Sequence, residues 1–326
     1  MGRRNFITLM GSAAILPLAA RAQPSAMPVI GWLSARSPAE AASVLQAFRQ
    51  GLGQVGDFEG KNITIEYRWA EGHYERLPEF AAELVRHQVA VIAATGGEPS
   101  PLAAKAATTS IPIVFTLGGD PVETGLVASL NRPGGNLTGT TIMALEMASK
   151  RLDLARQLVP NPTAIAMLIN PRFPTASAEA REVQNAARSL GIPINLLNAS
   201  TENEIDAAFT TAAEQKNGAL IMGTDPFLLG QRDQLVRLAA RHAIPTIYFL
   251  REFVEAGGLI SYGPNIANGY RQTGVYTGLI LNGANPADLP VVRPTQFLLY
   301  LNLKTAKTPG LQIPPLLLAL ADEVIE

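Results

Sequence analysis

The sequence predicts an α/β fold with two similar halves, each built on a parallel sheet. Residues 89–115 and 219–248 contain the same parts in the same order: apolar strand, glycine-containing turn, helix with small residues, Ile-Pro and a short second strand. Such internal similarity indicates a repeated supersecondary unit. Strand and helix patterns also alternate along the whole chain, which favours parallel strands connected by right-handed crossovers. Two similar halves suggest a binding site between them.

Length and composition agree with two packed domains. The chain has 326 residues, of which 47% are hydrophobic and 16% charged, so it can bury a large core and is not of the disordered class. It contains no cysteine, which excludes disulfides, thiolate metal sites and a cysteine nucleophile. Beyond the N-terminal segment, no apolar run reaches the ~18 residues of a membrane helix.

Residues 1–22 have the pattern of a twin-arginine signal peptide. Arg3 and Arg4 precede an apolar run of small residues, and Ala20-Arg21-Ala22 fits a cleavage site after Ala22. A short buried helix is the alternative. We therefore expect a periplasmic protein. The remaining chain is mildly acidic and has no basic run, so no nucleic-acid partner is expected.

The first half begins with an apolar strand at residues 27–33, followed by Ser37 and Pro38 as N-cap and first residue of a helix. Apolar residues at helical spacing from Val44 to Val55 continue that helix. Alternating apolar and polar residues at 63–67 predict a strand. The later elements expected before the middle of the chain are a helix at 77–85, the unit 89–115, a short helix at 122–130 and a strand at 137–142.

The second half repeats this rhythm. Gly191 is a C-cap signal for a helix at 176–190, which lies between expected strands at 164–169 and 193–197. The chain is expected to cross between lobes near 137–142 and again at 263–265. The expected lobe 1 is therefore 27–142 plus 263–292, and the expected lobe 2 is 143–262 plus 293–326. The remaining expected elements are helices at 145–159, 202–216, 266–281 and 303–307, the unit 219–248, and strands at 259–262 and 296–301.

Three segments resemble a known family. FRQGLGQVGDFEGKNITIEYRWAEG (48–72), GDPVETGLVASLNRPGGNLTG (119–139) and LNLKTAKTPGLQIPPLLLALADEVIE (301–326) are similar to bacterial ABC-transporter substrate-binding proteins of the tryptophan-import type. The resemblance implies a type I periplasmic-binding-protein fold, with two Rossmann-like lobes joined by three crossovers and a cleft that closes on a small ligand. It also implies an amino acid or related small organic molecule as ligand. We expect this ligand to be aromatic or branched, and we expect an ABC permease in the inner membrane as partner.

Ligands of open parallel sheets bind at the carboxyl ends of the strands, so the loops there supply the candidate residues. Thr95-Gly96-Gly97 precedes a helix and can present backbone N–H groups to a carboxylate, or can be a plain turn. Asp120 and Asp225 can each pair with a ligand ammonium or can cap a helix before proline. The full candidate set is Ser34, Arg36, Thr95, Gly96, Gly97, Thr116, Asp120, Asn170, Phe173, Thr224, Asp225, Phe227, Tyr248, Arg251 and Tyr262.

Some of these candidates have an equally ordinary structural explanation. Arg36 and Arg251 can clamp a carboxylate or can form surface ion pairs. Aromatic residues at the strand ends of lobe 2 can stack on a ligand or can fill the core. These aromatic residues are Phe173, Phe227, Tyr248 and Phe249.

The sequence lacks patterns for catalysis or for a cofactor. Residues 51–56 match G-x-G-x-x-G by letter but end an amphipathic helix, whereas a dinucleotide site requires a preceding strand. His73, His87 and His242 have no metal-ligand spacing. We expect no catalytic residue, metal or cofactor, and a monomeric solute-binding component of an ABC importer. The alternatives are an exported sensor subunit of the same fold and an exported two-lobe enzyme.

Overall fold

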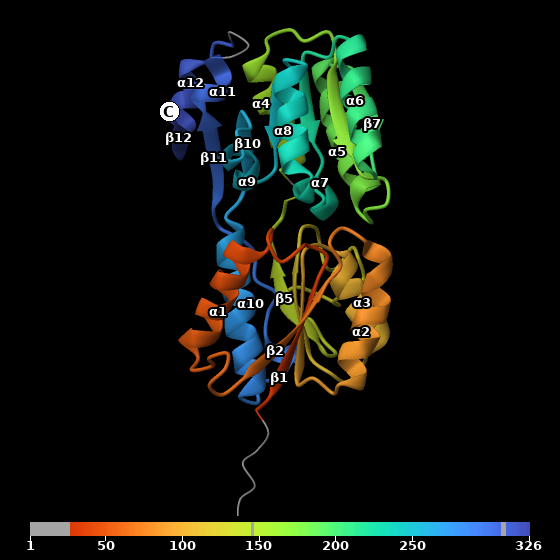
Figure 1. The fold of residues 1–326 in the computed structure, drawn as a ribbon, viewed down its shortest axis with the longest axis vertical. Helices are drawn as coiled ribbons and strands as arrows, with labels where there is room; N and C mark the ends of the chain where they lie inside the picture. The colour runs from red at the N-terminus through yellow and green to blue at the C-terminus, as the bar shows by residue number, and fades with distance from the viewer. Residues whose placement is uncertain (1–26, 145–146, 308–310) are drawn as a thin grey trace, which may run out of the picture.

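The structure, a computed structural model, describes residues 27–144, 147–307 and 311–326. The expected signal peptide and its cleavage site after Ala22 lie outside these residues. Within the described part of the chain, the strands form a five-stranded sheet in the order β2-β1-β3-β4-β5 and a seven-stranded sheet in the order β12-β11-β10-β9-β8-β6-β7. Each sheet belongs to a separate lobe, and the two lobes are stacked along the long axis of the molecule (Figure 1).

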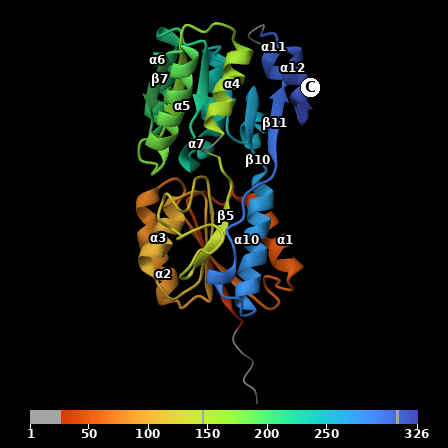
Figure 2. The ribbon, with the colours of Figure 1, turned by 180° about the vertical axis from the view of Figure 1, so that it is seen from behind.

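Lobe 1 is an all-parallel sheet with helices on both faces. The helices α2 (Leu77–Arg86) and α3 (Pro99–Ala107) pack together on one face, and α1 (Ala42–Gln54) and α10 (Ile266–Leu281) on the other (Figure 2). An added Cβ on Gly51 would overlap the carbonyl oxygen of Arg271, so glycine allows α1 and α10 to approach closely. The strands are β1 (Val29–Ser34), β2 (Thr64–Trp69), β3 (Val91–Thr95), β4 (Ile113–Leu117) and β5 (Leu137–Thr141).

Lobe 2 has a larger sheet that is parallel except at one pairing. The strand β11 (Phe297–Asn302) runs antiparallel to β10 (Ile260–Pro264) and parallel to β12 (Glu323–Ile325). The other strands are β6 (Ile165–Ile169), β7 (Ile194–Asn198), β8 (Ala219–Met222) and β9 (Thr246–Tyr248). The helices are α4 (Ala148–Leu158), α5 (Ala176–Leu190), α6 (Glu202–Glu214), α7 (Pro226–Gly230), α8 (Arg232–Arg241), α9 (Arg251–Glu255), α11 (Leu303–Lys307) and α12 (Pro315–Leu320).

The chain passes between the lobes three times. It leaves lobe 1 after β5, returns directly from Pro264 of β10 into α10, and leaves again through residues 290–296 into β11. Val292 pairs with Thr140 as an isolated bridge, so the first and third passages run side by side. This connectivity is the two-lobe, three-crossover architecture expected from the resemblance.

In both lobes the repeated unit connects two neighbouring parallel strands, but the helices between those strands differ. In lobe 1 a single helix, α3, connects β3 to β4, whereas in lobe 2 both α7 and α8 lie between β8 and β9. The two copies lie in different sheets, as the repeat predicted.

The expected helix at 122–130 was wrong. Residues 121–125 form successive turns, and Gly125 has a left-handed φ of 69° that ends any helical continuation. The segment at 314–325, for which the sequence predicted no element, contains α12 and β12.

Candidate functional site

The carboxyl ends of the strands of both lobes meet at a small cavity between the lobes. Its volume is about 30 Å³, which is room for about two water molecules. The lobes are therefore closed on each other. The residues that line this cavity include Arg36, Gly97, Glu98 and Tyr270 from lobe 1, and Phe173 and Asp225 from lobe 2.

The loop after β3 brings backbone atoms close to lobe 2. Gly96 and Gly97 have φ values of 81° and 102°, which favour glycine. A Cβ on Gly97 would lie 3.2 Å from Pro226 and 3.3 Å from the ring of Phe173. Glycine at this position therefore lets the two lobes close without a side chain between them.

Glu98 is a buried carboxylate at the base of this cavity. Its side chain is 0% exposed, and Oε1 accepts hydrogen bonds from the backbone N–H groups of Gly119 at 2.6 Å and Gly118 at 3.1 Å. Its Oε2 atom has no hydrogen-bond partner within the described ranges. Burial raises the pKa of Glu98 to about 7 against these hydrogen bonds, and the nearby Glu179 adds to the increase.

Asp225 connects three groups from both lobes. It is the N-cap of α7, where Oδ1 accepts from the Leu228 N–H at 2.7 Å. Its Oδ2 accepts from the Tyr74 hydroxyl of lobe 1 at 2.6 Å and from Nδ2 of Asn170 at 3.2 Å. Burial raises the pKa of Asp225 to about 6, while these three hydrogen bonds lower it.

Arg36 is a buried cation that faces the same cavity. Its residue is 5% exposed, and its Nε and Nη1 atoms have no hydrogen-bond acceptor among the residues that the structure describes. The guanidinium carbon lies 5.7 Å from the ring centroid of Tyr270 on α10. Since buried cations are costly without an anion, and a guanidinium fork fits a carboxylate, Arg36 is suited to a ligand carboxylate.

A buried ion pair supports the cleft from lobe 2. Nη2 of Arg151 lies 2.7 Å from Oε1 of Glu179, and the two side chains are 0% and 1% exposed. Glu179 also accepts from the backbone N–H and the hydroxyl of Thr224, each at 2.9 Å. Nη1 of Arg151 donates to the carbonyl of Ala144 in the first passage between the lobes. The pair therefore fixes the Thr224 loop relative to that passage.

The structure brings about half of the candidate residues to the cavity. Those that line it are Arg36, Gly96, Gly97, Thr116, Phe173, Thr224 and Asp225. Ser34, Thr95 and Asn170 are buried directly behind these residues rather than lining the space. Ser34 accepts from the backbone N–H of Arg36 at 3.2 Å, and Asn170 donates to Asp225, so both position cavity residues.

The other candidates lie elsewhere. Asp120 caps its own turn, with Oδ1 accepting from the Val122 N–H at 2.7 Å. The backbone N–H of Phe227 donates to Tyr74 at the edge of the cleft. Tyr262 packs near Phe297 in the lobe 2 sheet, and Tyr248 lines a different cavity.

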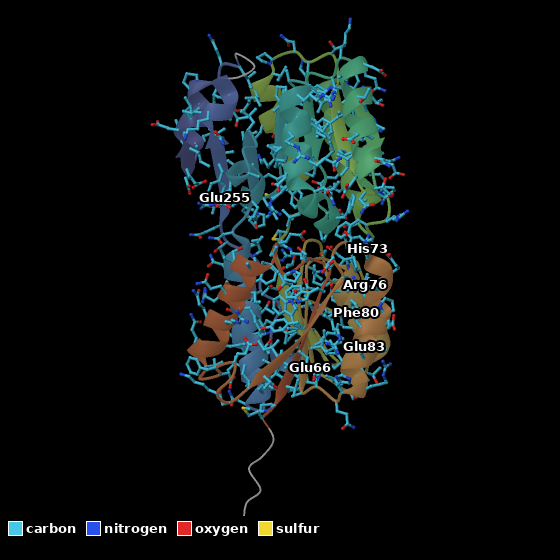
Figure 3. All side chains as sticks on the ribbon, viewed as in Figure 1. Glu66, His73, Arg76, Phe80, Glu83 and Glu255 are labelled. Carbon is cyan, nitrogen blue, oxygen red and sulfur yellow. The ribbon has the colours of Figure 1, made fainter. Side chains whose placement is uncertain are left out.

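Arg251 also lies away from the cavity. It pairs with Glu255 at 2.5 Å and with Glu323 at 3.0 Å, and its side chain is 45% exposed. Glu255 and His73, which precedes Tyr74, lie on opposite sides of the molecule near the lobe boundary (Figure 3). The exposed pairs of Arg251 with Glu255 and Glu323 are surface ion pairs, which the sequence analysis left open as the alternative for Arg251.

Sequence reasoning missed two chemically important residues. Glu98 stands between Gly97 and Pro99, and a charged residue in a glycine turn at a helix start is a signal that could have identified it. Tyr270 lies inside α10, where its spacing matches ordinary core residues. Among the described residues, there is no cluster of three or more His, Cys, Asp or Glu side chains that could hold a metal ion. No helix in the same ranges is both long and apolar enough to cross a membrane.

Two α/β lobes that close on a cavity with buried, oppositely charged groups define a binding protein for small solutes. Residues 36–325 match the family described as ABC transporter substrate binding protein, and the chain belongs to this family. It is thus the substrate-binding component of an ABC transporter. The family is a substrate-binding rather than an enzymatic one.

Several known proteins are similar to this chain. A tyrosine-binding protein from Clostridioides difficile is 26% identical over 268 residues, covering 82% of this chain and 76% of the relative. A conserved domain protein from Vibrio cholerae superposes with a TM-score of 0.85 at 25% identity. An ABC domain from Streptococcus pneumoniae in complex with L-Trp superposes with a TM-score of 0.82 at 24% identity. Both superpositions cover 91% of this chain and 99% of the other.

A ligand-free, open structure of a substrate-binding protein from Clostridium difficile has a lower TM-score of 0.66. It is 24% identical to this chain, and the superposition covers 91% of this chain and 99% of that one.

Proposed function

We propose that this protein binds an amino acid with an aromatic or branched apolar side chain between its lobes and delivers it to an ABC permease. In this proposal the chain is exported to the periplasm by a twin-arginine signal peptide cleaved after Ala22. It acts there as a monomer, without a cofactor and without catalytic activity. Its lobes comprise 27–142 plus 263–292 and 143–262 plus 293–326.

One observation carries the ligand class. Arg36 and Glu98 both line the cavity, both are buried, and each has polar atoms without a partner in the described part of the chain. An amino acid zwitterion offers a carboxylate for the Arg36 fork and an ammonium for Oε2 of Glu98. Such charge-assisted hydrogen bonds remove the cost of two otherwise unmatched buried charges.

The remaining lining of the cavity supports an apolar side chain on the ligand. Phe173, Phe249 and Tyr270 contribute rings, and Ile142 and Leu250 contribute aliphatic surface. Rings of this kind favour an aromatic ligand through edge or offset stacking. The names of two similar proteins, one tyrosine-binding and one in complex with L-Trp, agree with this choice.

Binding requires the lobes to open and close. A cavity of about 30 Å³ cannot admit an aromatic amino acid, so the ligand must enter when the lobes are apart. The higher TM-score to the L-Trp complex than to the open, ligand-free structure agrees with a closed arrangement of the lobes here. A ligand that contacts both lobes shifts the equilibrium by its preference for the closed form.

The proposal is tested by isothermal titration calorimetry of the purified mature protein with aromatic, aliphatic and acidic L-amino acids. We expect L-tyrosine or L-tryptophan to bind most tightly, with binding lost for the deaminated and decarboxylated analogues. The proposal is wrong if none of the amino acids binds, or if an analogue that lacks the ammonium group binds as tightly as the amino acid itself.

A further inference from the structure

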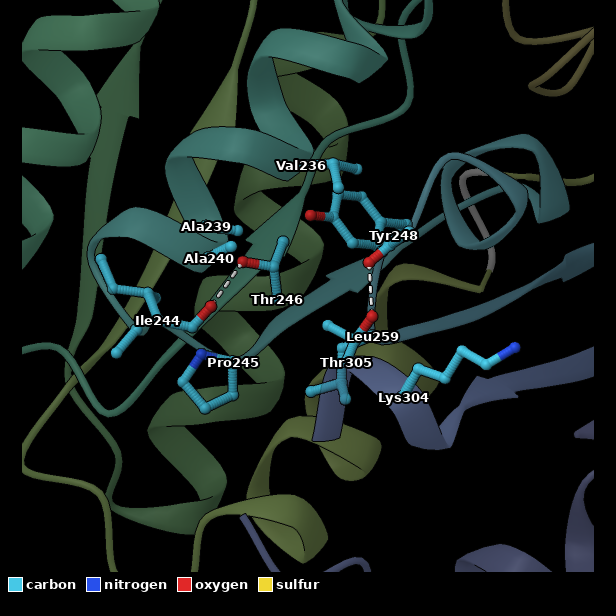
Figure 4. Close-up of a pocket in the computed structure, with 13 residues that line it drawn as sticks. Val236, Ala239, Ala240, Ile244, Pro245, Thr246, Tyr248, Leu259, Lys304 and Thr305 are labelled. Carbon is cyan, nitrogen blue, oxygen red and sulfur yellow. Dashed lines mark hydrogen bonds between the residues drawn. The ribbon is translucent and has the colours of Figure 1, made fainter. Parts of the chain in front are cut away.

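Arg151 contacts residues of the cleft without lining the cavity between the lobes. It belongs to α4 of lobe 2, and its side chain is 0% exposed. The residues that line the cleft cavity do not include it, nor do those of the larger apolar cavity between α8 and the start of α11 (Figure 4). Because a buried guanidinium is costly unless it is paired, the groups that it contacts indicate its role.

In lobe 2, the Arg151 guanidinium holds a loop that lines the cleft cavity. Its Nη2 atom donates to Oε1 of Glu179 at 2.7 Å and to the Thr224 hydroxyl at 3.2 Å. The Thr224 hydroxyl donates in turn to the same Glu179 oxygen, and the Thr224 N–H donates to the other one. These bonds form a closed set, so they fix the position of the Thr224 loop.

Toward lobe 1, the same guanidinium is connected to Glu98 through two backbone groups. Nη1 of Arg151 donates to the Ala144 carbonyl at 3.2 Å, and the Ala144 N–H donates to the Gly118 carbonyl at 2.8 Å. The Gly118 N–H donates to Oε1 of Glu98 at 3.1 Å. A continuous series of hydrogen bonds therefore leads from the buried cation of lobe 2 to the carboxylate of lobe 1 that lines the cavity.

The two ends of this network meet at Gly118. A Cβ added there would lie 3.5 Å from Oε1 of Glu98, 3.8 Å from Cβ of Ala144 and 3.8 Å from Cγ2 of Thr224. Groups from both lobes and from the first passage between them therefore surround one backbone position. A shift of the guanidinium would change the distance between the Thr224 wall and the Glu98 wall of the closed cavity.

The pair of Arg151 and Glu179 also acts on Glu98 through its charges. Burial is the main cause of the raised pKa of Glu98, and the Glu179 carboxylate adds to it. The guanidinium lies 2.7 Å from Glu179, so its positive charge opposes this second effect. Glu98 can therefore ionise more easily beside the intact pair than beside Glu179 alone.

We propose that Arg151 and Glu179 are positioning residues for ligand binding, which set the Thr224 wall of lobe 2 against the Gly118 and Glu98 wall of lobe 1 in the closed form. Neither residue lines the cavity, so both act through other groups. This role rests on the proposed function, because it requires a ligand ammonium at Glu98. A guanidinium suits the role because its planar fork donates toward Ala144 and toward Glu179 at the same time.

The first test is Arg151→Lys, which keeps the charge and removes the fork. We expect the affinity for the best-binding amino acid to fall about tenfold, as for loss of one charge-assisted hydrogen bond. The pH below which affinity falls should stay as in the wild type, because the charge beside Glu179 is retained. Calorimetry at pH values on both sides of the Glu98 pKa measures both quantities. Arg251→Lys, which changes exposed pairs with Glu255 and Glu323, is the control and should alter neither.

The second test is Glu179→Gln, which removes a negative charge near Glu98 while the guanidinium stays charged. The pKa of Glu98 should therefore fall, and binding of the amino acid should persist to lower pH than in the wild type. A role confined to folding would lower the free energy of unfolding without moving this pH dependence. Urea unfolding of the ligand-free variants separates the two effects.

Unchanged affinity in Arg151→Lys, or wild-type pH dependence in Glu179→Gln, would overturn the proposal. The two substitutions change opposite ends of the pair, so if circular dichroism shows that one variant is unfolded, the other decides. Failure of the proposed function gives a different result, because the wild-type protein itself would then bind no amino acid.

Discussion

The Tyr74 hydroxyl of lobe 1 donates a hydrogen bond of 2.6 Å to Oδ2 of Asp225 in lobe 2. The same hydroxyl accepts from the backbone N–H of Phe227 at 3.2 Å, so one side chain bonds twice across the cleft. Burial and the neighbouring Asp225 carboxylate raise the pKa of Tyr74 well above its ordinary value, which keeps it a neutral donor. This contact holds the lobes in the closed arrangement.

Replacing Tyr74 by phenylalanine should weaken ligand binding about tenfold. The closed form loses the hydrogen bond to the Asp225 carboxyl group, worth roughly 1.5 kcal/mol, and the weaker one from the Phe227 N–H, whereas the open form loses neither. Calorimetry with the best amino acid measures the change. The matched control is Tyr67→Phe, because the Tyr67 hydroxyl bonds only within lobe 1, to Glu59 and Arg49. Equal effects of the two substitutions would contradict a role for Tyr74 in closure.

Replacing Arg36 by glutamine should separate binding from stability. Loss of the buried partner of a ligand carboxylate should weaken binding by at least about 2 kcal/mol, or roughly 30-fold. The stability of the ligand-free protein should not fall, because a buried cation without an acceptor is itself costly. Calorimetry and urea unfolding measure the two effects. Arg49→Gln, which removes an exposed pair with Glu59, is the control and should leave affinity unchanged.

The raised pKa values of Glu98 and Asp225, about 7 and about 6, predict the pH dependence of stability. Between their ordinary values and about pH 7 the folded chain binds more protons than the unfolded chain, so the free energy of unfolding decreases as pH rises through this window. Urea unfolding without ligand at several pH values measures the slope. Glu98→Gln should flatten it, whereas Glu83→Gln on the surface should not. A slope that is unchanged in Glu98→Gln would refute the assignment.

The same carboxyl predicts proton release on binding. An ammonium ligand binds ionised Glu98, so below about pH 7 ligand binding must displace a proton and affinity should fall as pH decreases. Calorimetry in buffers of different ionisation enthalpy, at about pH 6, counts the protons released. Proton uptake, or no proton exchange at all, would show that Glu98 does not face the ammonium.

The buried pair of Arg151 and Glu179 should be costly to break. Arg151→Met leaves Glu179 buried without its cation, which should destabilise the fold by about 3–5 kcal/mol. Arg251→Met removes exposed pairs with Glu255 and Glu323 and should cost less than about 1 kcal/mol. Urea unfolding compares the variants. Similar losses for both would mean that burial does not set the strength of the Arg151 pair.

Most of the fold was predictable because strands buried on both faces leave long apolar runs, and helices leave apolar residues at regular spacing. The repeat at 89–115 and 219–248 further placed two loops opposite each other. The helix expected at 122–130 failed because its apolar spacing did not reveal the left-handed conformation of Gly125. The antiparallel direction of β11 is a tertiary property that no local pattern encodes.

The site was less predictable than the fold. Their positions after strands predicted that Arg36 and Asp225 lie near the cleft, and both line the cavity. Position alone, however, does not give the direction of a side chain. Tyr248 ends a strand like the others, yet its ring faces the α8 side of the sheet. Glu98 was hidden because the Gly118 and Gly119 amides that hold it come from a loop about twenty residues away.

The central claim is that an amino acid zwitterion lies between Arg36 and Glu98 in the closed cleft. Its most direct test is a crystal structure of the mature protein with the tightest-binding amino acid. The account predicts carboxylate oxygens within about 3.2 Å of Nε and Nη1 of Arg36, and the ammonium at hydrogen-bond distance from Oε2 of Glu98. A ligand bound outside the cleft, or one whose charged groups contact neither side chain, would contradict it.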